Sequence, residues 1–244
     1  GIKWVKFPRI GRSMASNDIE RLKQEYARRA LDAEKDYSPT HPLQAFILSQ
    51  RYTALQALLR NHHLQDSSNL RILEIGCGSG GVLSEFIKLG ASANNLFGID
   101  LLPNRLRPAH SLIPAASLCQ ADGQRLPYLP ETFDLVLQFT AFSSILDPHV
   151  KHNMAAEMLR VLKPRGALIW YDFWWNPTNI QTKGIRFKEI RTLFPGCSFK
   201  IRRITLAPPI ARKVVPISLS LAKVLESFRI FNSHYLVLIR KNNS

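Results

Sequence analysis

The feature that most constrains this chain is a short apolar strand that runs into a glycine turn and then into a helix. Residues 72–75, Ile-Leu-Glu-Ile, predict a buried strand. Gly76, Gly78 and Gly80 follow it, permit a tight turn and let a ligand approach the backbone closely. Apolar residues then recur at helical spacing before a stop at Gly90. These residues are Val82, Leu83, Phe86 and Ile87. A strand, a glycine turn and a helix N-terminus form a nucleotide-binding corner.

Two kinds of nucleotide fit this corner. The pattern Gly-x-Gly-x-x-Gly over residues 76–81 satisfies the dinucleotide fingerprint, with Asp100 at roughly the expected distance of about 20 residues. Three other features favour S-adenosylmethionine. Glu74 precedes the first glycine by two residues, where a carboxylate suits an ammonium group better than a pyrophosphate. Asp100 ends a second strand, where it can accept both ribose hydroxyls, and Asp122 follows a third strand, where it can hold an adenine amine.

On these residues the chain resembles the class I S-adenosylmethionine-dependent methyltransferases, the broad group that includes the quinone-biosynthesis enzymes. The resemblance covers roughly residues 65 to 175, and its pieces occur in the family's order. Arg165 replaces the first glycine of the pair that usually ends the last piece. The pieces are residues 73–81, 99–100, 122–123, 126–127, 133–136 and 159–166.

The predicted fold is α/β, a Rossmann-like, doubly wound sheet. Alternating strands and helices between residues 70 and 172 indicate parallel strands with helices on both faces. The resemblance implies seven mostly parallel strands with an antiparallel edge formed by the last two. We expect an N-terminal helical cap over residues 1–64, in helices starting near Asn17 and Pro42, and a cofactor-binding domain over residues 65–244. The cap either covers the cofactor or only packs on the sheet.

A helical insert of about residues 206–232 separates the last two predicted strands. It is either a lid over the substrate, an amphipathic segment that touches a membrane surface or a partner, or a helix packed on the sheet.

The resemblance assigns cofactor roles to ten positions. The glycine backbone makes room for the methionine and ribose, Glu74 lies near the methionine ammonium, and Asp100 binds the ribose diol. Leu101 lies against the adenine face, Asp122 accepts from its amine, and Gln138 lies at the methionine end. Structural alternatives are a loop-capping carboxylate for Glu74, a helix cap for Asp100, a turn aspartate for Asp122, a loop-satisfying amide for Gln138 and a packing residue for Cys77. The ten positions are Glu74, Gly76, Cys77, Gly78, Gly80, Asp100, Leu101, Asp122, Gly123 and Gln138.

Acceptor residues are expected where the fourth and fifth strands end, because ligands bind outside the carboxyl ends of such strands. Asp172 is the first candidate for a base or an acceptor-orienting group, with Tyr171 beside it in an aromatic segment. His149, at the start of the next helix, is a further candidate, although a solvated helix face would look the same. The three predicted catalytic residues are therefore Asp172, His149 and Tyr171.

The predicted reaction is an in-line transfer of the sulfonium methyl group, in which the protein mainly supplies proximity and alignment. No paired metal ligands appear, so a metal-independent reaction on a small or carrier-bound acceptor is expected. The frequency of O-methylation in the family favours an oxygen acceptor. After the fourth strand the chain reads Gln-Phe-Thr-Ala over residues 138–141, which lacks the Pro-Pro motif of amine methyltransferases that act on DNA or glutamine. Natural-product or cell-surface glycan biosynthesis is the expected context.

Positive charge gathers in the last third of the chain. The net charge is +15, and residues 171–244 contain 13 basic and 3 acidic residues. This bias suits an anionic acceptor, an anionic membrane surface or, as an alternative function, an RNA substrate. No separate RNA-binding module appears, so no nucleic-acid partner is expected, while peripheral membrane contact stays open. The oligomeric state is not predicted.

The remaining composition points to an ordinary globular protein. Three cysteines without ligand spacing indicate neither zinc nor disulfides, and no apolar run is long enough to span a bilayer. A cytoplasmic location is the expectation. Two other classes stay open: a nicotinamide-dependent dehydrogenase, and a cofactor-binding regulator that no longer methylates.

Overall fold

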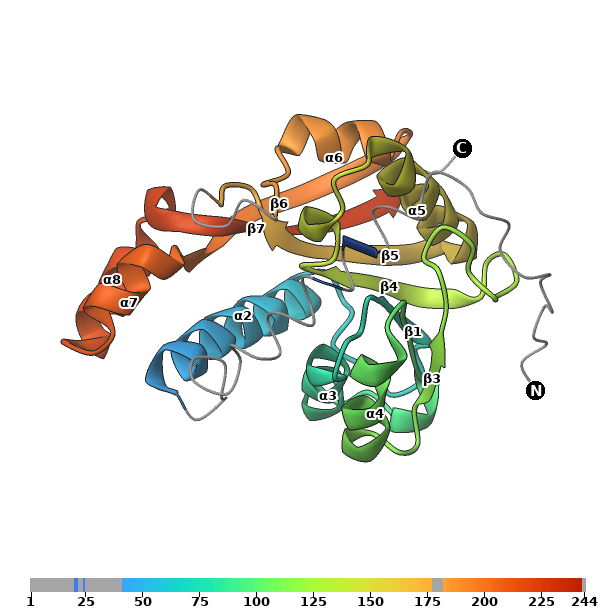
Figure 1. Cartoon of the computed structure of the whole chain (residues 1–244), viewed down its shortest axis with the longest axis horizontal. Coiled ribbons are helices and arrows are strands. Elements are labelled where there is room, and N and C mark those ends of the chain that lie inside the picture. Colours follow the sequence, from blue (N-terminus) through green and yellow to red (C-terminus); the bar gives the residue numbers. More distant parts are fainter. Residues whose placement is uncertain (1–19, 22–23, 25–40, 177–181, 243–244) are drawn as a thin grey trace.

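A seven-stranded sheet forms the centre of the molecule (Figure 1). The computed structural model describes residues 20–21, 24, 41–176 and 182–242. The strand order is β3-β2-β1-β4-β5-β7-β6; β1 to β5 are parallel, and β7 runs antiparallel between β5 and β6. The predicted doubly wound sheet with an antiparallel edge is confirmed. The strands are β1 Ile72–Ile75, β2 Leu96–Asp100, β3 Ser117–Gln120, β4 Phe133–Phe139, β5 Leu162–Phe173, β6 Cys197–Leu206 and β7 Asn232–Lys241.

The strand order reverses at β1, which pairs with β2 on one side and β4 on the other. All four residues of β1 are buried, because helices cover both faces of the sheet. The connections from β1 and β4 therefore leave the sheet in opposite directions, and a crevice opens between their carboxyl ends. This is the place where ligands bind in open α/β sheets.

Helices form a layer on each face of the sheet (Figure 1). Alternate residues of β5 contact opposite layers: Trp170 packs in one core cluster with Met154, and Tyr171 packs in the other with Leu55. The alternation follows from the two-residue period of a strand. The Trp170 side is covered by α5 and α6, and the Tyr171 side by α2, α3 and α4. The helices are α2 Pro42–Asn61, α3 Gly81–Lys88, α4 Pro103–Leu112, α5 Pro148–Val161 and α6 Phe187–Leu193.

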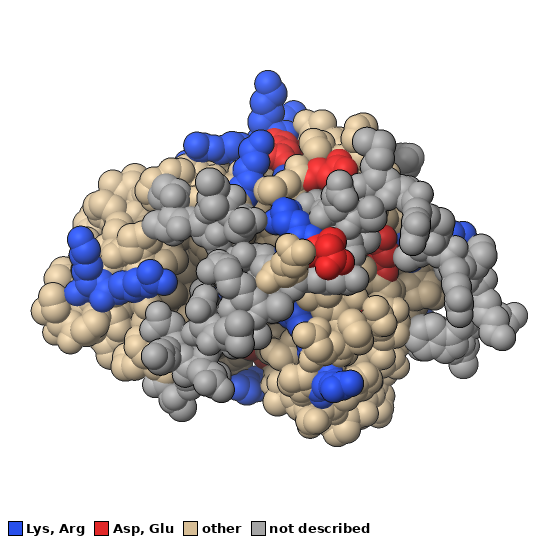
Figure 2. All heavy atoms as spheres, in the orientation of Figure 1, with Lys and Arg blue, Asp and Glu red and all other residues tan. Residues whose placement is uncertain are grey.

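The predicted insert between β6 and β7 is helical. It contains α7 (Pro208–Val214), α8 (Leu219–Ser227) and a short 3-10 turn, Arg229–Phe231. Its inner face packs on the N-terminal half of α2, where Ala211, Val215 and Ala222 share a core cluster with α2 residues. Figure 2 shows Lys and Arg side chains among uncharged residues on this lobe, at the left of the view.

The fifth strand is longer than the sequence predicts. The expected range is residues 167–171, and the observed strand is Leu162–Phe173. Pro164 and Gly166 indicate a turn, yet they lie at an irregularity where the pairing register with β4 shifts, and such a position tolerates proline.

The helix predicted from Asn17 lies outside the described residues except for Glu20, Arg21 and Gln24, which are helical. The division into a cap and a core domain stays a prediction.

Among the helices that the structure describes, none combines the length and the apolar character that crossing a bilayer requires.

Candidate active site

A cavity opens at the carboxyl ends of β1, β2 and β4. Its walls come from the glycine turn, the end of β2, the loop after β3 and the turn after β4. Of the predicted cofactor residues, Gly76, Asp100, Leu101, Asp122 and Gly123 line it. The sequence analysis missed other lining residues, which come from helices and turns that only packing brings to the cavity. Those are Arg105, Ala141, Ser144, Ile145, Val150 and Met154.

The glycine turn is held open by backbone geometry. The φ angles of Gly76, Gly78 and Gly80 are 75°, 51° and 80°, values that residues with a side chain rarely adopt. The N–H groups of Gly76 and Cys77 donate to the carbonyl of Ile99 at 2.8 and 2.9 Å, which ties the turn to β2. A Cβ at Gly78 would collide with the guanidinium of Arg105. Of the three glycines, Gly76 lines the cavity, whereas Gly78 and Gly80 face Arg105 and Ala109 of α4.

Asp100 is locked at the tip of β2. Its Oδ2 accepts from the Gly78 N–H and its Oδ1 from the Leu102 N–H, both at 2.9 Å. Arg105 approaches Oδ2 at 3.7 Å, and the carboxylate is almost fully buried. Each carboxylate oxygen has a further lone pair that can accept a hydroxyl. The structural and the ligand-binding interpretations of Asp100 are thus compatible, because the same bonds that order the loop aim the carboxylate.

Asp122 and Gly123 form the opposite wall. The Oδ1 of Asp122 accepts from the Gln124 N–H at 2.9 Å, and the Gln124 amide lies 3.2 Å from Oδ2. A Cβ at Gly123 would lie 2.8 Å from the Met154 terminal methyl, so a larger residue would require the Met154 side chain to move. Met154 therefore has two roles: it packs in the core, and it forms part of the cavity wall.

Glu74 is not on the cavity wall. Its side chain is buried near Arg51 of α2 and Glu85 of α3, and those two side chains form an ion pair. Three atoms of this buried charge cluster have no hydrogen-bond partner among the described residues: Glu74 Oε2, Glu85 Oε2 and Arg51 Nε. Burial raises the pKa of the Glu74 carboxyl well above its ordinary value, and the charge of Arg51 opposes this. Burying a charged group without a hydrogen-bond partner costs folding free energy. These unpaired atoms therefore indicate a site for a polar ligand or water.

Cys77 lies in the glycine turn as a buried thiol. Burial, followed by the negative charge of Glu74, raises its pKa, which keeps the thiol protonated and unreactive. It packs with the core on the α3 side, so it contributes its backbone N–H to the turn and its side chain to packing.

Asp172 and Gln138 form a buried pair behind the cavity. Gln138 Nε2 donates to Asp172 Oδ2 at 2.8 Å, and the Ser143 N–H donates to the same oxygen at 3.0 Å. The Phe173 N–H donates to Oδ1 at 2.8 Å. Burial raises the pKa of Asp172, while these hydrogen bonds lower it. Neither side chain lines the cavity, and their bonds connect the ends of β4 and β5 to the turn at Phe142–Ser144.

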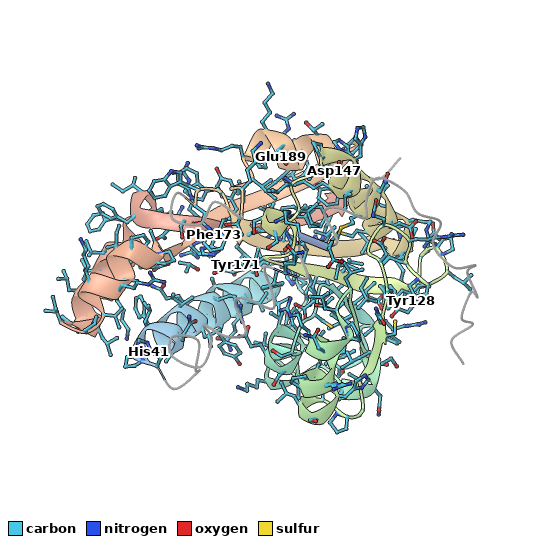
Figure 3. All side chains as sticks on the ribbon, viewed as in Figure 1. His41, Tyr128, Asp147, Tyr171, Phe173 and Glu189 are labelled. Atoms are coloured by element: carbon cyan, nitrogen blue, oxygen red, sulfur yellow. The ribbon has the colours of Figure 1, made fainter. Side chains whose placement is uncertain are left out.

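Tyr171 points to the other face of the sheet. Its hydroxyl lies 2.9 Å from Thr205 Oγ1, and its ring stacks on His234 with centroids 4.6 Å apart. Burial raises the pKa of Tyr171 to about 12, so the phenol stays protonated at neutral pH. Figure 3 shows Tyr171 and Phe173 near the middle of the molecule, next to α2.

His149 lies on the exposed first turn of α5. Its backbone N–H donates to the capping carboxylate of Asp147 at 2.8 Å. The structure therefore does not bring the three predicted catalytic side chains together: His149 is exposed, and Asp172 and Tyr171 project from opposite faces of β5. Their assignment as a catalytic group stays a prediction. Within the described residues, no cluster of three His, Cys, Asp or Glu side chains has metal-ligand geometry.

Comparison with known proteins agrees with this geometry. Residues 72–166 match the family described as a methyltransferase domain. The chain is 32% identical over 115 residues to the sterol 4-C-methyltransferase strm-1 of Caenorhabditis elegans, a match that covers 45% of this chain and 33% of that protein. It is 33% identical over 114 residues to the phthiotriol/phenolphthiotriol dimycocerosates methyltransferase of Mycobacterium leprae, covering 46% and 40%. The chain thus matches well under half the length of these relatives.

Solved structures share the fold at low sequence identity. A SAM-dependent methyltransferase from Archaeoglobus fulgidus superposes with a TM-score of 0.53 at 16% identity, covering 78% of this chain and 94% of that one. A putative sarcosine dimethylglycine methyltransferase from Galdieria sulphuraria gives 0.56 at 15% identity, covering 78% and 85%. The glycine turn, the two carboxylates at the strand tips, the match of residues 72–166 and the shared fold together support a class I S-adenosylmethionine-dependent methyltransferase, with S-adenosylmethionine as its cofactor.

Proposed function

We propose that this protein transfers the methyl group of S-adenosylmethionine, without a metal ion, to a hydroxyl oxygen of a small or carrier-linked lipid acceptor. The observation that carries the proposal is the cavity beside the glycine turn, where Asp100 and Asp122 face an open space over bare backbone. The bound cofactor supplies an electrophilic methyl group. The chain's own residues then have to hold the two ends of the cofactor, align the acceptor and exclude water.

The adenosine end is assigned to the cavity. Asp100 offers two carboxylate oxygens, already oriented by the Gly78 and Leu102 N–H groups, to the ribose diol. Leu101 supplies apolar contact to the adenine, and Asp122 with the Gly123 backbone faces its amine. The apolar side chains of Ile99, Ile145 and Met154 complete a wall that suits a flat base.

The amino-acid end is assigned to the buried charge cluster. The methionine part of the cofactor carries an ammonium and a carboxylate. Glu74 Oε2 and Arg51 Nε are unpaired within the described residues and have opposite charges, which matches these two groups. Arg51 is the principal neighbour of opposite charge for Glu74. We infer that the cofactor, directly or through water, completes the hydrogen bonding that the protein alone leaves incomplete.

The acceptor is assigned to the ends of β4 and β5. Transfer to a hydroxyl releases one proton from the acceptor oxygen, and a base within hydrogen-bond reach accelerates it. The buried carboxylate of Asp172 positions the Phe142–Ser144 turn, next to Ser144 on the cavity wall. Tyr171 is protonated and is suited to donate a hydrogen bond. His149 is exposed on α5 and does not line the cavity, so its role in transfer stays a prediction.

A lipid acceptor is favoured by the relatives. The names of the two matched enzymes give a sterol and dimycocerosates as what they methylate. At the end of β5 the ring of His234 stacks on Tyr171 and contacts Phe173 at a tilt, so a largely buried aromatic cluster lies where the acceptor is expected. An RNA methyltransferase remains the second candidate, supported by the excess of 13 basic over 3 acidic residues in residues 171–244.

Isothermal titration calorimetry with S-adenosylmethionine tests the cofactor assignment. We expect binding by the wild type, weaker binding by Asp100→Asn, and unchanged binding by Asp134→Asn, a matched control whose carboxylate pairs with Lys163 away from the cavity. Release of S-adenosylhomocysteine with hydroxylated lipids then tests transfer. Heat of binding with NAD but none with S-adenosylmethionine would establish the dehydrogenase instead. Cofactor binding without turnover on lipid or RNA acceptors would indicate a regulator.

A further inference from the structure

The insert between β6 and β7 has two faces of different character. Its inner face packs on α2 through Ala211, Val215 and Ala222. On α8, the apolar residues Leu221, Val224 and Phe228 are instead exposed, at 47%, 53% and 57% of their surface. Their spacing of three and four residues places them on one side of the helix. Ala222 is buried against the domain, so these three side chains lie on the side of α8 that faces solvent.

Further apolar side chains extend this outer surface at both ends of α8. Ile217, in the turn before the helix, is 81% exposed, and Ile230, in the 3-10 turn after it, is 72% exposed. Leu219, at the first position of α8, is also about half exposed, but it lies two residues before Leu221 and therefore on another side of the helix. We call Ile217 and Ile230, together with the exposed Leu221, Val224 and Phe228, the α8 apolar patch. Contiguous apolar patches of this kind mark interaction sites on soluble proteins.

The α8 apolar patch is accompanied by positive charge. Arg212 and Lys213 end α7, Lys223 lies within α8, and Arg229 begins the following 3-10 turn. All four are exposed, while Glu226, the single acidic residue between positions 206 and 232, is partly buried and accepts from Asn232. A surface with exposed apolar side chains and a cationic border has the chemistry of interfacial helices that lie in a lipid headgroup layer.

We propose that the α8 apolar patch docks the protein onto an anionic lipid membrane, with α8 lying in the interface. Charge decides between a membrane and a second copy of this chain. A twofold contact through this surface would bring two sets of the same four cations into one interface, and their mutual repulsion opposes association. Anionic headgroups instead neutralise the cations while the apolar side chains enter the acyl boundary.

Docking through this surface has a consequence for the site, which rests on the proposed function. The insert packs on Leu43 and Phe46 in the N-terminal half of α2. The same helix carries Arg51 in the buried charge cluster and places its guanidinium 5.8 Å from the Tyr171 ring centroid. One helix thus spans from the docking lobe to the residues assigned to the cofactor and acceptor, so a lipid acceptor would not have to leave the membrane fully to reach them.

Vesicle flotation of the whole chain tests the docking. The probes are phosphatidylcholine vesicles and vesicles in which about one lipid in three is phosphatidylglycerol. We expect binding to the anionic vesicles alone. The triple variant Leu221→Ser, Val224→Ser, Phe228→Ser should reduce this partitioning on the order of a hundredfold, because three half-exposed apolar side chains are lost. The control triple Ile87→Ser, Leu112→Ser, Leu129→Ser removes three exposed apolar side chains elsewhere and should partition like the wild type.

A double variant that removes two positive charges tests how much the headgroups contribute to binding. Lys223→Gln with Arg229→Gln should weaken binding about thirtyfold, since each cation near an anionic surface contributes about fivefold. The matched pair Lys188→Gln with Arg191→Gln, exposed on α6, should change it little.

The inference is overturned if the wild type does not float with anionic vesicles. It is also overturned if the test and control variants lose vesicle binding equally. A wild-type dimer that the triple variant converts to monomer, without vesicle binding, would assign the surface to a second copy. Cofactor affinity, measured in the same variants without lipid, separates the two proposals, and the variants should bind the cofactor as the wild type does. If the wild type itself does not bind the cofactor, the proposed function is contradicted, while vesicle binding can still be observed.

Discussion

Glu74→Gln should make the protein without its cofactor more stable and its cofactor binding weaker. The carboxylate is buried, one of its oxygens has no partner among the described residues, and burial raises its pKa well above the ordinary 4.5. The folded protein therefore binds more protons than the unfolded chain from pH 4.5 up to the raised pKa. The free energy of unfolding falls as the pH rises across that window. A neutral amide removes this loss.

The size of both effects follows from the cost of an unpaired buried group. Leaving such a group unsatisfied costs about 1–3 kcal/mol, so the melting temperature of the cofactor-free variant should rise by roughly 3–8 °C at about pH 8. At about pH 5 the difference should be smaller, because the wild-type carboxyl is then largely protonated. A lost charge-assisted hydrogen bond of about 1.5–3 kcal/mol should raise the cofactor Kd roughly 10- to 150-fold.

Glu85→Gln provides the matched control, because it makes the same change on the neighbouring carboxylate. Glu85 is paired with Arg51, so its neutralisation leaves a nearly buried guanidinium with its main partner gone. Stability should then fall, on the order of 3 kcal/mol, in the opposite direction to Glu74→Gln. Thermal melts at the same two pH values and calorimetry with S-adenosylmethionine measure these effects. A Glu74→Gln protein that melts lower than the wild type, or binds the cofactor equally well, would refute the assignment of Glu74.

Three further predictions concern pH, the ribose site and the glycine turn. Burial, followed by the charge of Arg51, lowers the pKa of His234 to about 3, so the unfolded chain binds more protons between pH 3 and 6.5. Stability should drop by about 1.4 kcal/mol per pH unit below about pH 6.5, and His234→Phe, which keeps a ring against Tyr171, should flatten that slope in urea titrations at about pH 5 and 7. Asp100→Asn should raise the cofactor Kd at least about tenfold by calorimetry, because an amide has only one acceptor oxygen; an unchanged Kd would contradict its contact with the ribose. Gly76→Ala should cost roughly 1–2 kcal/mol in a thermal melt, because φ is 75° and the new methyl would lie 3.0 Å from Ala141 Cβ; a neutral effect would show that the turn relaxes.

Local sequence was sufficient for the cofactor corner. The strand at residues 72–75, the glycine turn and the acid at the tip of β2 are adjacent in the chain or one β-α unit apart. Parallel β-α units place the ends of successive strands at the same edge of the sheet. Recognising these strands in the sequence therefore predicts that Asp100 and Asp122 lie at that edge. The sequence also predicted that Gly123 belongs to the site. It did not predict that Met154 approaches this glycine closely.

Long-range packing decided what the acceptor side looks like. Asp172 and Tyr171 are neighbours in sequence, and a strand sends neighbours to opposite faces, so they cannot act side by side. Their actual partners, Ser143 and Thr205, lie 29 and 34 residues away, and no periodicity predicts such pairs.

The sequence by itself determined the order of strands and helices and the bare backbone at which the adenosine end is expected, because these depend on hydrophobic period and on glycine's lack of a Cβ. Only the tertiary structure decided that Glu74 shares a buried cluster with Arg51, and that the insert packs on α2 with its other face exposed. Those outcomes depend on contacts between segments far apart in the chain. Such contacts form only when the chain folds, so local sequence patterns do not reveal them.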